Sequence, residues 1–219
     1  MFEKLPESLG RVLQGQRSGI ENIAFRHLLL NREVPRIAVR SGAFDNMGAI
    51  PVQFTADGDG VSPPLEWASV PSATTCVALI VEDADSPTAH PLVHAIAVIG
   101  AGLGRLQTGA LPTGDGAGSG VEMGLNSFLR RSWLPPDPPP GHGPHRYAFQ
   151  LFALGEGAAS FSHALGRQEL METILNRAIA AGCLIGTYER ARRQNNEETE
   201  ETDKNVEISE SDSAAPSVA

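Results

Sequence analysis

The side chains of this 219-residue chain that are best suited to chemistry fall into two separate segments. In the first, Asp83, Asp85 and Pro87 follow an apolar run, and His94 lies inside the next apolar run. A carboxylate beside an imidazole can exchange protons with it, fix its tautomer, or hold a ligand that carries both donors and acceptors. This segment is therefore a candidate binding or acid–base site.

The second segment follows a run of prolines and contains His145, Arg146 and Tyr147. Successive side chains of a strand point to opposite faces, so His145 and Tyr147 share one face and Arg146 points to the other. Two histidines and a tyrosine hydroxyl that converge on one cavity make good donors for a phosphate or carboxylate.

Each of these residues also has an ordinary structural explanation. A histidine inside an apolar strand is often a core residue with satisfied hydrogen bonds, and aspartates at turns often bond the local backbone. His90 and His94 have the spacing of zinc ligands on a helix, but Pro91 and the surrounding valines and isoleucines favour a strand, which would separate them. We therefore expect no metal and no cofactor.

The elements that must position these residues are mainly strands. The segments 75–82, 92–99 and 146–154 are almost continuously apolar, as in strands that are buried on both faces. If the first two segments form a hairpin, its turn brings Asp83 to His94. Residues 100–144 form a long stretch rich in glycine and proline, and such long connections are often functional.

Helices are expected at both ends of this β-rich region. Apolar residues recur with helical spacing between Leu5 and Leu30, and Gly15 and Gly19 favour two short helices there. A second helical stripe runs from Leu170 to Ile179, with Gly182 placed just after its end, and the CLIGTY segment then predicts a short last strand.

Charge and composition exclude several classes of protein. The net charge is −9, but from residue 194 onward eight acidic residues face one lysine, which accounts for seven of the nine negative charges. The body of the chain has no basic stripe for nucleic acid and no apolar run long enough to span a bilayer. Cys76 and Cys183 are expected to be free thiols, and no secretory signal is evident, so we expect a cytoplasmic protein.

In this order, the motifs resemble the phosphatidylethanolamine-binding protein (PEBP) family, in its bacterial Raf-kinase-inhibitor-like branch (YbhB/YbcL type). The resemblance runs from about residue 41 to 190. The motifs are SGAF at 41–44, IP at 50–51, FTADG at 54–58, SPPLEW at 62–67, VP at 70–71, DADSP at 83–87, GLNS at 124–127 and GHGPHRY at 141–147.

The resemblance implies a mainly β fold: a β-sandwich with a large, mostly antiparallel sheet, a smaller sheet, and N-terminal and C-terminal helices. We expect an N-terminal helical extension at residues 1–34, a PEBP-like domain at 35–191 and a disordered acidic tail at 192–219. The tail is expected to be disordered because it is acidic and lacks aromatic residues and apolar clusters.

The resemblance also implies a pocket for a phosphate-sized anion. Its positions match Asp83, Pro87, His94, His145 and Tyr147, while Asp85 and Arg146 match positions that brace two loops by a salt bridge. Two residues depart from the usual pattern of the proline-rich wall. Trp133 would make the pocket rim bulkier, and Asp137 would repel phosphate if it faced the pocket.

These residues favour a binding or regulatory protein for a phosphorylated or carboxylated small ligand or headgroup. Two alternatives stay open: an inhibitor of a protein kinase or protease that acts through the pocket loops, and a metal-free acid–base hydrolase that uses Asp83 and His94. An evident nucleophile is missing, since Ser86 and Ser127 are candidates only by position, which favours binding over catalysis. Relatives of this kind tend to form dimers, so a homodimer is a further expectation.

Overall fold

The structure is a computed structural model that describes residues 7–114, 120–157 and 165–190. The acidic segment 192–219, for which the sequence predicts disorder, lies outside the described residues. Within the described part of the chain, no helix has the length and apolar character needed to cross a bilayer.

Three α-helices, two short 3-10 helices (η) and eight strands (β) make up the described fold. In chain order they are α1 (Glu7–Leu13), η2 (Ile20–Asn22), α2 (Ala24–Asn31), β1 (Ala38–Arg40), η3 (Val52–Phe54), β2 (Leu65–Ala68), β3 (Cys76–Asp83), β4 (Leu92–Gly100), β5 (Arg105–Leu106), β6 (Val121–Met123), β7 (His145–Leu154), α3 (Arg167–Arg177) and β8 (Ala178–Tyr188).

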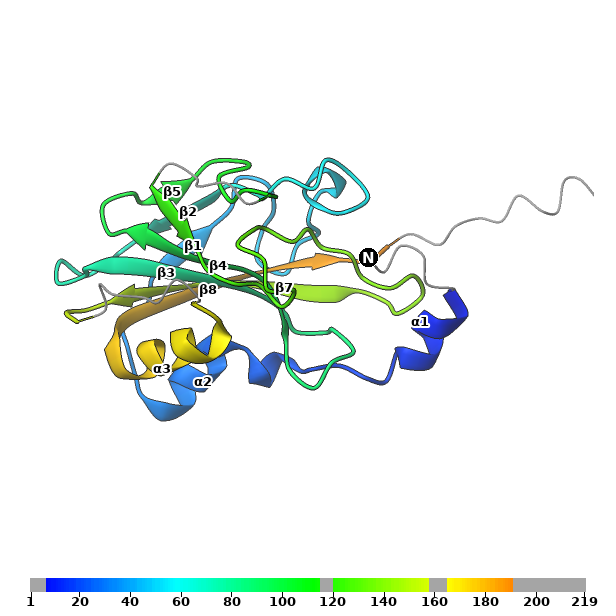
Figure 1. Ribbon diagram of the computed structural model, residues 1–219, viewed down its shortest axis with the longest axis horizontal. Coiled ribbons are helices and arrows are strands. Elements are labelled where there is room, and N and C mark those ends of the chain that lie inside the picture. The colour runs from blue at the N-terminus through cyan, green and yellow to red at the C-terminus, as the bar shows by residue number, and fades with distance from the viewer. Residues whose placement is uncertain (1–6, 115–119, 158–164, 191–219) are drawn as a thin grey trace, which may run out of the picture.

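The elements form three layers. A five-stranded sheet of order β6-β4-β3-β7-β8 lies in the middle, a three-stranded sheet of order β1-β2-β5 covers one face, and α2 and α3 cover the other (Figure 1). Every pair of neighbouring strands within the two sheets is antiparallel. The expected β-sandwich with a large sheet, a smaller sheet and helices is therefore confirmed.

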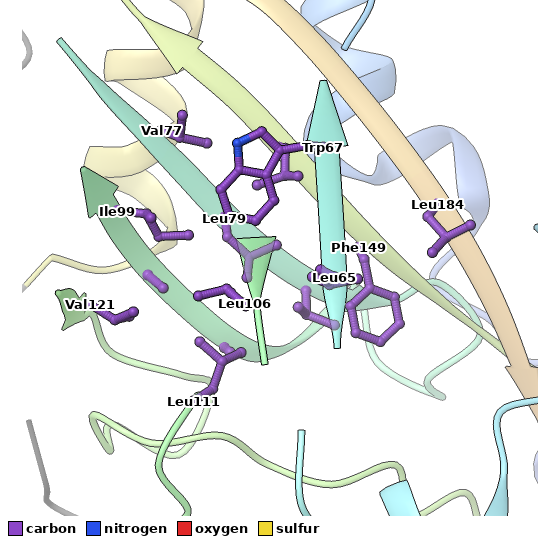
Figure 2. Close-up of a cluster of buried hydrophobic side chains, with 14 of the residues drawn as sticks. Leu65, Trp67, Val77, Leu79, Ile99, Leu106, Leu111, Val121, Phe149 and Leu184 are labelled. Atoms are coloured by element: carbon purple, nitrogen blue, oxygen red, sulfur yellow. The ribbon is translucent and has the colours of Figure 1, made fainter. Parts of the chain in front are cut away.

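The apolar strands of the large sheet are buried on both faces because each face has its own core. Along β3, Val77, Leu79 and Val81 point toward the small sheet, where they meet side chains such as Trp67 (Figure 2). The alternate residues Cys76, Ala78 and Ile80 belong to the second core, beneath the helices. This explains why the strand segments lack the polar alternation of a half-exposed sheet.

A buried carboxylate joins the helical layer to the sheet. Glu82 on β3 is fully buried, and its Oε2 accepts hydrogen bonds from the backbone N–H of Ala24 and from Nε2 of Gln150, both at 2.8 Å. Its Oε1 lies 2.7 Å from Nε of Arg167. Because α2 has no side-chain N-cap of its own, Glu82 takes that role from a distant strand.

The N-terminal region agrees with the prediction of short helices interrupted by glycines. Helix α1 ends at Leu13, before Gly15, and η2 and α2 follow Gly19. The chain between them runs beside β3, since Ser18 N–H donates to the carbonyl of Ser86 and Gly19 N–H donates to that of Ala84. The segment between the helices is thus fixed against the end of the large sheet.

The prediction for the C-terminal helix was wrong at its end. Helix α3 ends at Arg177, and β8 begins at once at Ala178 and pairs ten of its eleven residues with β7, instead of starting near Cys183. Gly182 lies inside this strand and does not follow a helix. A Cβ there would collide with the carbonyl of Ile37, so the glycine permits a close backbone approach, and helical spacing alone could not reveal this.

Candidate functional site

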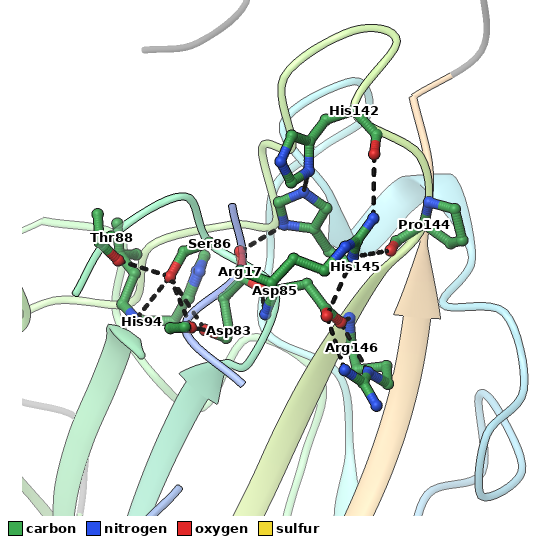
Figure 3. A network of polar contacts seen from close by, with 12 residues as sticks. Arg17, Asp83, Asp85, Ser86, Thr88, His94, His142, Pro144, His145 and Arg146 are labelled. Atoms are coloured by element: carbon green, nitrogen blue, oxygen red, sulfur yellow. Dashed lines mark hydrogen bonds and ion pairs between the residues drawn. The ribbon is translucent and has the colours of Figure 1, made fainter. Parts of the chain in front are cut away.

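Asp83, His94 and His145 lie together at the end of the large sheet where β3 ends and β7 begins (Figure 3). Asp83, the last residue of β3, is paired with Leu92 on β4 and with Tyr147 on β7. His94 and His145 lie close to these two positions along their own strands. The meeting of the two chemical segments is therefore a consequence of the strand order β4-β3-β7.

Asp83 binds His145 rather than His94. Its Oδ2 lies 2.7 Å from Nδ1 of His145, and its Oδ1 accepts the backbone N–H of Asp85 at 2.8 Å. The hairpin of β3 and β4 forms as expected, but no hydrogen bond joins Asp83 to His94 among the described residues. The carboxylate therefore fixes the imidazole on the neighbouring strand β7.

His145 is the middle member of a longer chain of hydrogen bonds. Its Nε2 lies 2.7 Å from Nδ1 of His142, and Nε2 of His142 lies 2.8 Å from the carbonyl oxygen of Leu13 in α1. Both imidazoles are almost completely buried, with exposed fractions of 1% and 0%. We call Asp83, His145, His142 and the Leu13 carbonyl the histidine row.

The partners in the histidine row determine where its hydrogens lie. The Leu13 carbonyl only accepts, so His142 carries its hydrogen on Nε2, and Nδ1 of His142 accepts from Nε2–H of His145. A second hydrogen lies between Nδ1 of His145 and the Asp83 carboxylate. Asp83 and His145 together therefore hold one proton more than an ionised carboxylate and a neutral imidazole, and the pair has no net charge.

His142 keeps the neutral form that this pattern requires. Burial lowers the pKa of His142, and the nearby charge of His145 lowers it further. The hydrogen between His142 and His145 therefore belongs to Nε2 of His145.

His94 offers an acceptor without a partner. Its Nδ1 lies 2.7 Å from the carbonyl oxygen of Leu134, which fixes the hydrogen on Nδ1. Its Nε2 is buried and has no hydrogen-bond partner among the described residues. Burial lowers the pKa of His94, so this ring stays neutral and Nε2 keeps its lone pair.

The hydroxyl of Tyr147 is a second buried polar atom of the site that has no hydrogen-bond partner in the described part of the chain. The rings of Tyr147 and His94 are nearly perpendicular, with centroids 5.2 Å apart and an interplanar angle of 85°. The Tyr147 ring also stacks on that of His145, with centroids 6.3 Å apart. Burial and the charges of Asp83 and Asp137 raise the pKa of Tyr147 well above its usual value. The hydroxyl is therefore protonated and able to donate.

A small cavity lies beside His94 and His145, lined by Asp83, Ser86, Pro87, Leu92, His94, Phe128, Leu134, Pro135, Asp137, Pro139 and His145. Tyr147, whose ring packs against His94, is not one of these lining residues. Its volume is about 20 Å³, counted as the space that the centre of a water molecule can reach. One water molecule needs about 10–15 Å³ on this measure. The cavity thus has room for the oxygen end of an acid group, and the rest of a ligand would lie outside.

Asp85 and Arg146 brace the loops on both sides of the cavity. Asp85 accepts from the backbone N–H and the side chain of Arg146 at 2.7–2.8 Å, and Nη1 of Arg17 lies 3.0 Å from its Oδ1. Arg17 also donates to the carbonyls of Pro144 and His142. The N-terminal segment therefore contributes one arm of the brace.

Asp137 lines the cavity, and its carboxylate shares the guanidinium of Arg190 with Asp57. Its Oδ1 lies 2.6 Å from Nη2 of Arg190, which also lies 2.8 Å from Asp57. Asp57 in turn accepts from the hydroxyl of Tyr188 at 2.6 Å. The repulsion of phosphate that was expected from an isolated carboxylate at this wall is thus reduced by the guanidinium of Arg190.

Trp133 lies inside the core rather than at the rim. Its side chain is 2% exposed, stacks on Phe149 with centroids 6.2 Å apart, and donates from Nε1 to the carbonyl of Gly60. It does not line the cavity. Because a tryptophan N–H usually finds a partner when buried, this position anchors the proline-rich wall to the small-sheet side of the core.

Sequence reasoning missed His142, Arg17 and Arg190. His142 lies three residues before His145 in a turn, and this spacing was a readable signal for a shared site. Arg17 and Arg190 gave no such signal, because their partners lie more than fifty residues away in the sequence. No group of three metal-ligating side chains is arranged to hold an ion within the described ranges.

Comparison with known sequences places the chain in a family. The family described as phosphatidylethanolamine-binding protein matches residues 40–189, so the chain belongs to the PEBP family. A relative from Aquifex aeolicus, called a UPF0098 protein, is 33% identical over 159 residues, covering 69% of this chain and 88% of the relative. A UPF0098 protein of Mycobacterium tuberculosis is 35% identical over 153 residues, covering 70% of each chain.

Solved structures show the same fold. The structure of a putative PEBP homologue from Chlamydia trachomatis has a TM-score of 0.63 at 30% identity, and covers 71% of this chain and 99% of its own. The structure of YbcL from Escherichia coli, described as a member of the mammalian PEBP family, has a TM-score of 0.65 at 25% identity with the same coverage.

Proposed function

We propose that this protein is a binding or regulatory protein whose cavity takes the acid group of a small phosphorylated or carboxylated ligand. The observation that carries the proposal is the unpartnered, buried Nε2 of His94, whose hydrogen is held on the opposite nitrogen by Leu134. Buried polar atoms are nearly always hydrogen-bonded, so an orphan acceptor next to a cavity favours a ligand that donates to it.

The charges around the cavity define the form of the acid group. Asp83 lies beside His145, and Asp137 shares the Arg190 guanidinium with Asp57, so the cavity offers no large excess of positive charge. A phosphate monoester monoanion, or a carboxylic acid, has a hydroxyl that can donate to His94 and an oxygen that can accept from Tyr147. We therefore expect a phosphate monoester to bind better at pH 6 than at pH 8, since the second pKa of such an ester lies near 6.

The two tyrosines of the chain provide a matched test. The Tyr147 hydroxyl has no partner among the described residues, so Tyr147→Phe should preserve or raise the free energy of unfolding and weaken phosphate binding about tenfold. Tyr188→Phe removes a hydroxyl that donates to Asp57 outside the cavity, so it should lower stability and leave phosphate affinity unchanged. Calorimetric titration and thermal unfolding with phosphate measure the two effects.

Equal phosphate affinity for the wild type and Tyr147→Phe would contradict the proposal. The absence of any thermal shift with millimolar phosphate at pH 6 would also count against it.

The contacts of Ser86 favour binding over hydrolysis. Its hydroxyl lies near Ser18 and Thr88 at 3.2 and 2.8 Å, and also lies 3.2 Å from the carbonyl of Asp83. The hydroxyl is therefore bound to groups other than an imidazole, which is the group that would activate it as a nucleophile.

The cytoplasmic location and the homodimer belong to the same proposal, and cell fractionation and light scattering test them. A relative from M. tuberculosis carries the name putative lipoprotein LppC.

A further inference from the structure

A second and larger concavity lies beside the cavity. We call it the groove, and it is lined by Thr88, Ala89, His90, Pro91, Leu92, Val93, Leu125, Asn126, Ser127, Phe128, Leu129, Gly166 and Arg167. Its volume is about 580 Å³, on the same measure as the 20 Å³ of the cavity. Leu92 and Phe128 line both spaces, so a ligand too large for the cavity meets the groove next.

The groove presents an apolar side chain in an unfavourable backbone conformation. Leu129 has φ of 57° and its side chain is 78% exposed. A bulky residue in the left-handed region is unusual and persists only where its surroundings impose it, often at a ligand site. Both the exposure and the conformation of Leu129 therefore require an explanation.

Asn126 supplies the local constraint. Its side chain is buried, and Oδ1 accepts the backbone N–H groups of Phe128 and Arg130 at 2.9 and 3.1 Å, while Nδ2 donates to the carbonyl of Ser132. The N–H of Leu129 donates to the Asn126 carbonyl. The buried side chain of Asn126 thus fixes this turn, and the turn places Phe128 and Leu129 in the lining of the groove.

The described lining of the groove lacks the negative charge that a binding site for an amine needs. The described lining contains no aspartate or glutamate, and its one charged side chain is the Arg167 guanidinium, which is bound to Glu82 and to the Asn22 carbonyl. An ammonium group would find no counter-ion here, whereas an apolar group would cover Leu129 and Phe128.

We propose that the groove binds the organic part of a small phosphate monoester, and that this part is aromatic or otherwise apolar rather than an alkylammonium. The inference rests on the proposed function, since it requires the phosphate in the cavity. The groove then decides which phosphorylated compound is preferred.

The test compares three probes by calorimetric titration of the full chain at pH 6: inorganic phosphate, phenyl phosphate and O-phosphoethanolamine. Phenyl phosphate should bind about tenfold more tightly than inorganic phosphate, because burying part of Leu129 and a phenyl ring from water gives an effect of that order. O-phosphoethanolamine should bind no more tightly than inorganic phosphate.

Two matched glycine variants separate ligand binding from folding. Leu129→Gly suits the left-handed conformation and removes the apolar side chain, so it should unfold no earlier than the wild type and lose the preference for phenyl phosphate. Met47→Gly makes the same change at another exposed left-handed residue, with φ of 64°, outside the groove, and should keep the preference.

The inference is overturned if phosphate binds but phenyl phosphate gains nothing, or if Leu129→Gly retains the full preference. It is also overturned if vesicles of equal parts phosphatidylethanolamine and phosphatidylcholine bind the protein more strongly than phosphatidylcholine alone, because a membrane surface would then be the occupant. If none of the three soluble probes binds, the proposed function fails, and this inference fails with it.

Discussion

Replacing Asp85 with asparagine should test whether the brace between the two pocket loops depends on its charge. The carboxylate is 1% exposed and accepts hydrogen bonds from Arg146 and Arg17. Burial alone would raise the pKa of Asp85, but the hydrogen bonds and charges of Arg146, together with the hydrogen bond from Arg17, lower it to about 2. The carboxyl group is therefore ionised in the folded protein at any ordinary pH.

The magnitude follows from linkage. A fall from 3.8 to about 2 corresponds to about 2 kcal/mol of folded-state stabilisation, since each unit of pKa is worth about 1.4 kcal/mol. Because the folded-state pKa is depressed, this stabilisation is fully present above the unfolded value and is lost as the pH falls from about 4 to about 2. Asp85→Asn should therefore cost about 2 kcal/mol at pH 7, or about 5 °C in Tm, and almost nothing near pH 2.

Urea denaturation of the wild type and Asp85→Asn at pH 7, 5, 3 and 2 measures this difference directly. Asp59→Asn, at an exposed position, is the control and should follow the wild type at every pH. A stability difference that is equally large at pH 7 and pH 2 would refute the reasoning, because the loss would then not come from the charge. Phosphate affinity should fall in Asp85→Asn, since Asp85 holds the loop that carries Ser86 and Pro87, which line the cavity.

Two further predictions concern the buried histidines. Burial lowers the pKa values of both His94 and His142, so below pH 6.5 the unfolded chain binds protons that the folded protein does not. The free energy of unfolding should therefore fall as the pH drops from about 6.5 to 5, by up to about 1.4 kcal/mol per pH unit for each ring. Denaturation midpoints that stay constant over this range would contradict that expectation. His142→Phe leaves His145 and the Leu13 carbonyl without their partner, so it should cost about 2–3 kcal/mol and speed amide hydrogen exchange at Ser18 and Gly19. Unchanged exchange at these two amides would show that the histidine row does not hold the N-terminal segment.

The strands and the facing of the site residues could be predicted from the sequence because both depend on local patterns. Continuous apolar runs predicted the buried strands, and the period of two put His145 and Tyr147 on one face and Arg146 on the other. The pairing of Arg146 with Asp85 came from the family resemblance. The order of the motifs then supplied the family fold. These features need no knowledge of which distant segments meet.

The contacts that the sequence did not predict join segments far apart in the chain. Arg190 forms an ion pair with Asp137, and Glu82 caps a helix that starts at Ala24. Gly182 permits the approach of Ile37, although its position resembled a helix end. Periodicity describes one element at a time, so a charge pair or a close approach between two elements leaves no mark in either pattern.

The N-terminal segment changes the chemistry of the pocket although it lies outside the family match at residues 40–189. The Leu13 carbonyl accepts the hydrogen of His142, which makes His142 an acceptor for His145 and thereby places the second hydrogen of His145 toward Asp83. Without that carbonyl, His142 could donate to His145 instead of accepting from it. A residue of α1 therefore fixes where the hydrogens of the pocket histidines lie, from outside the residues that match the family.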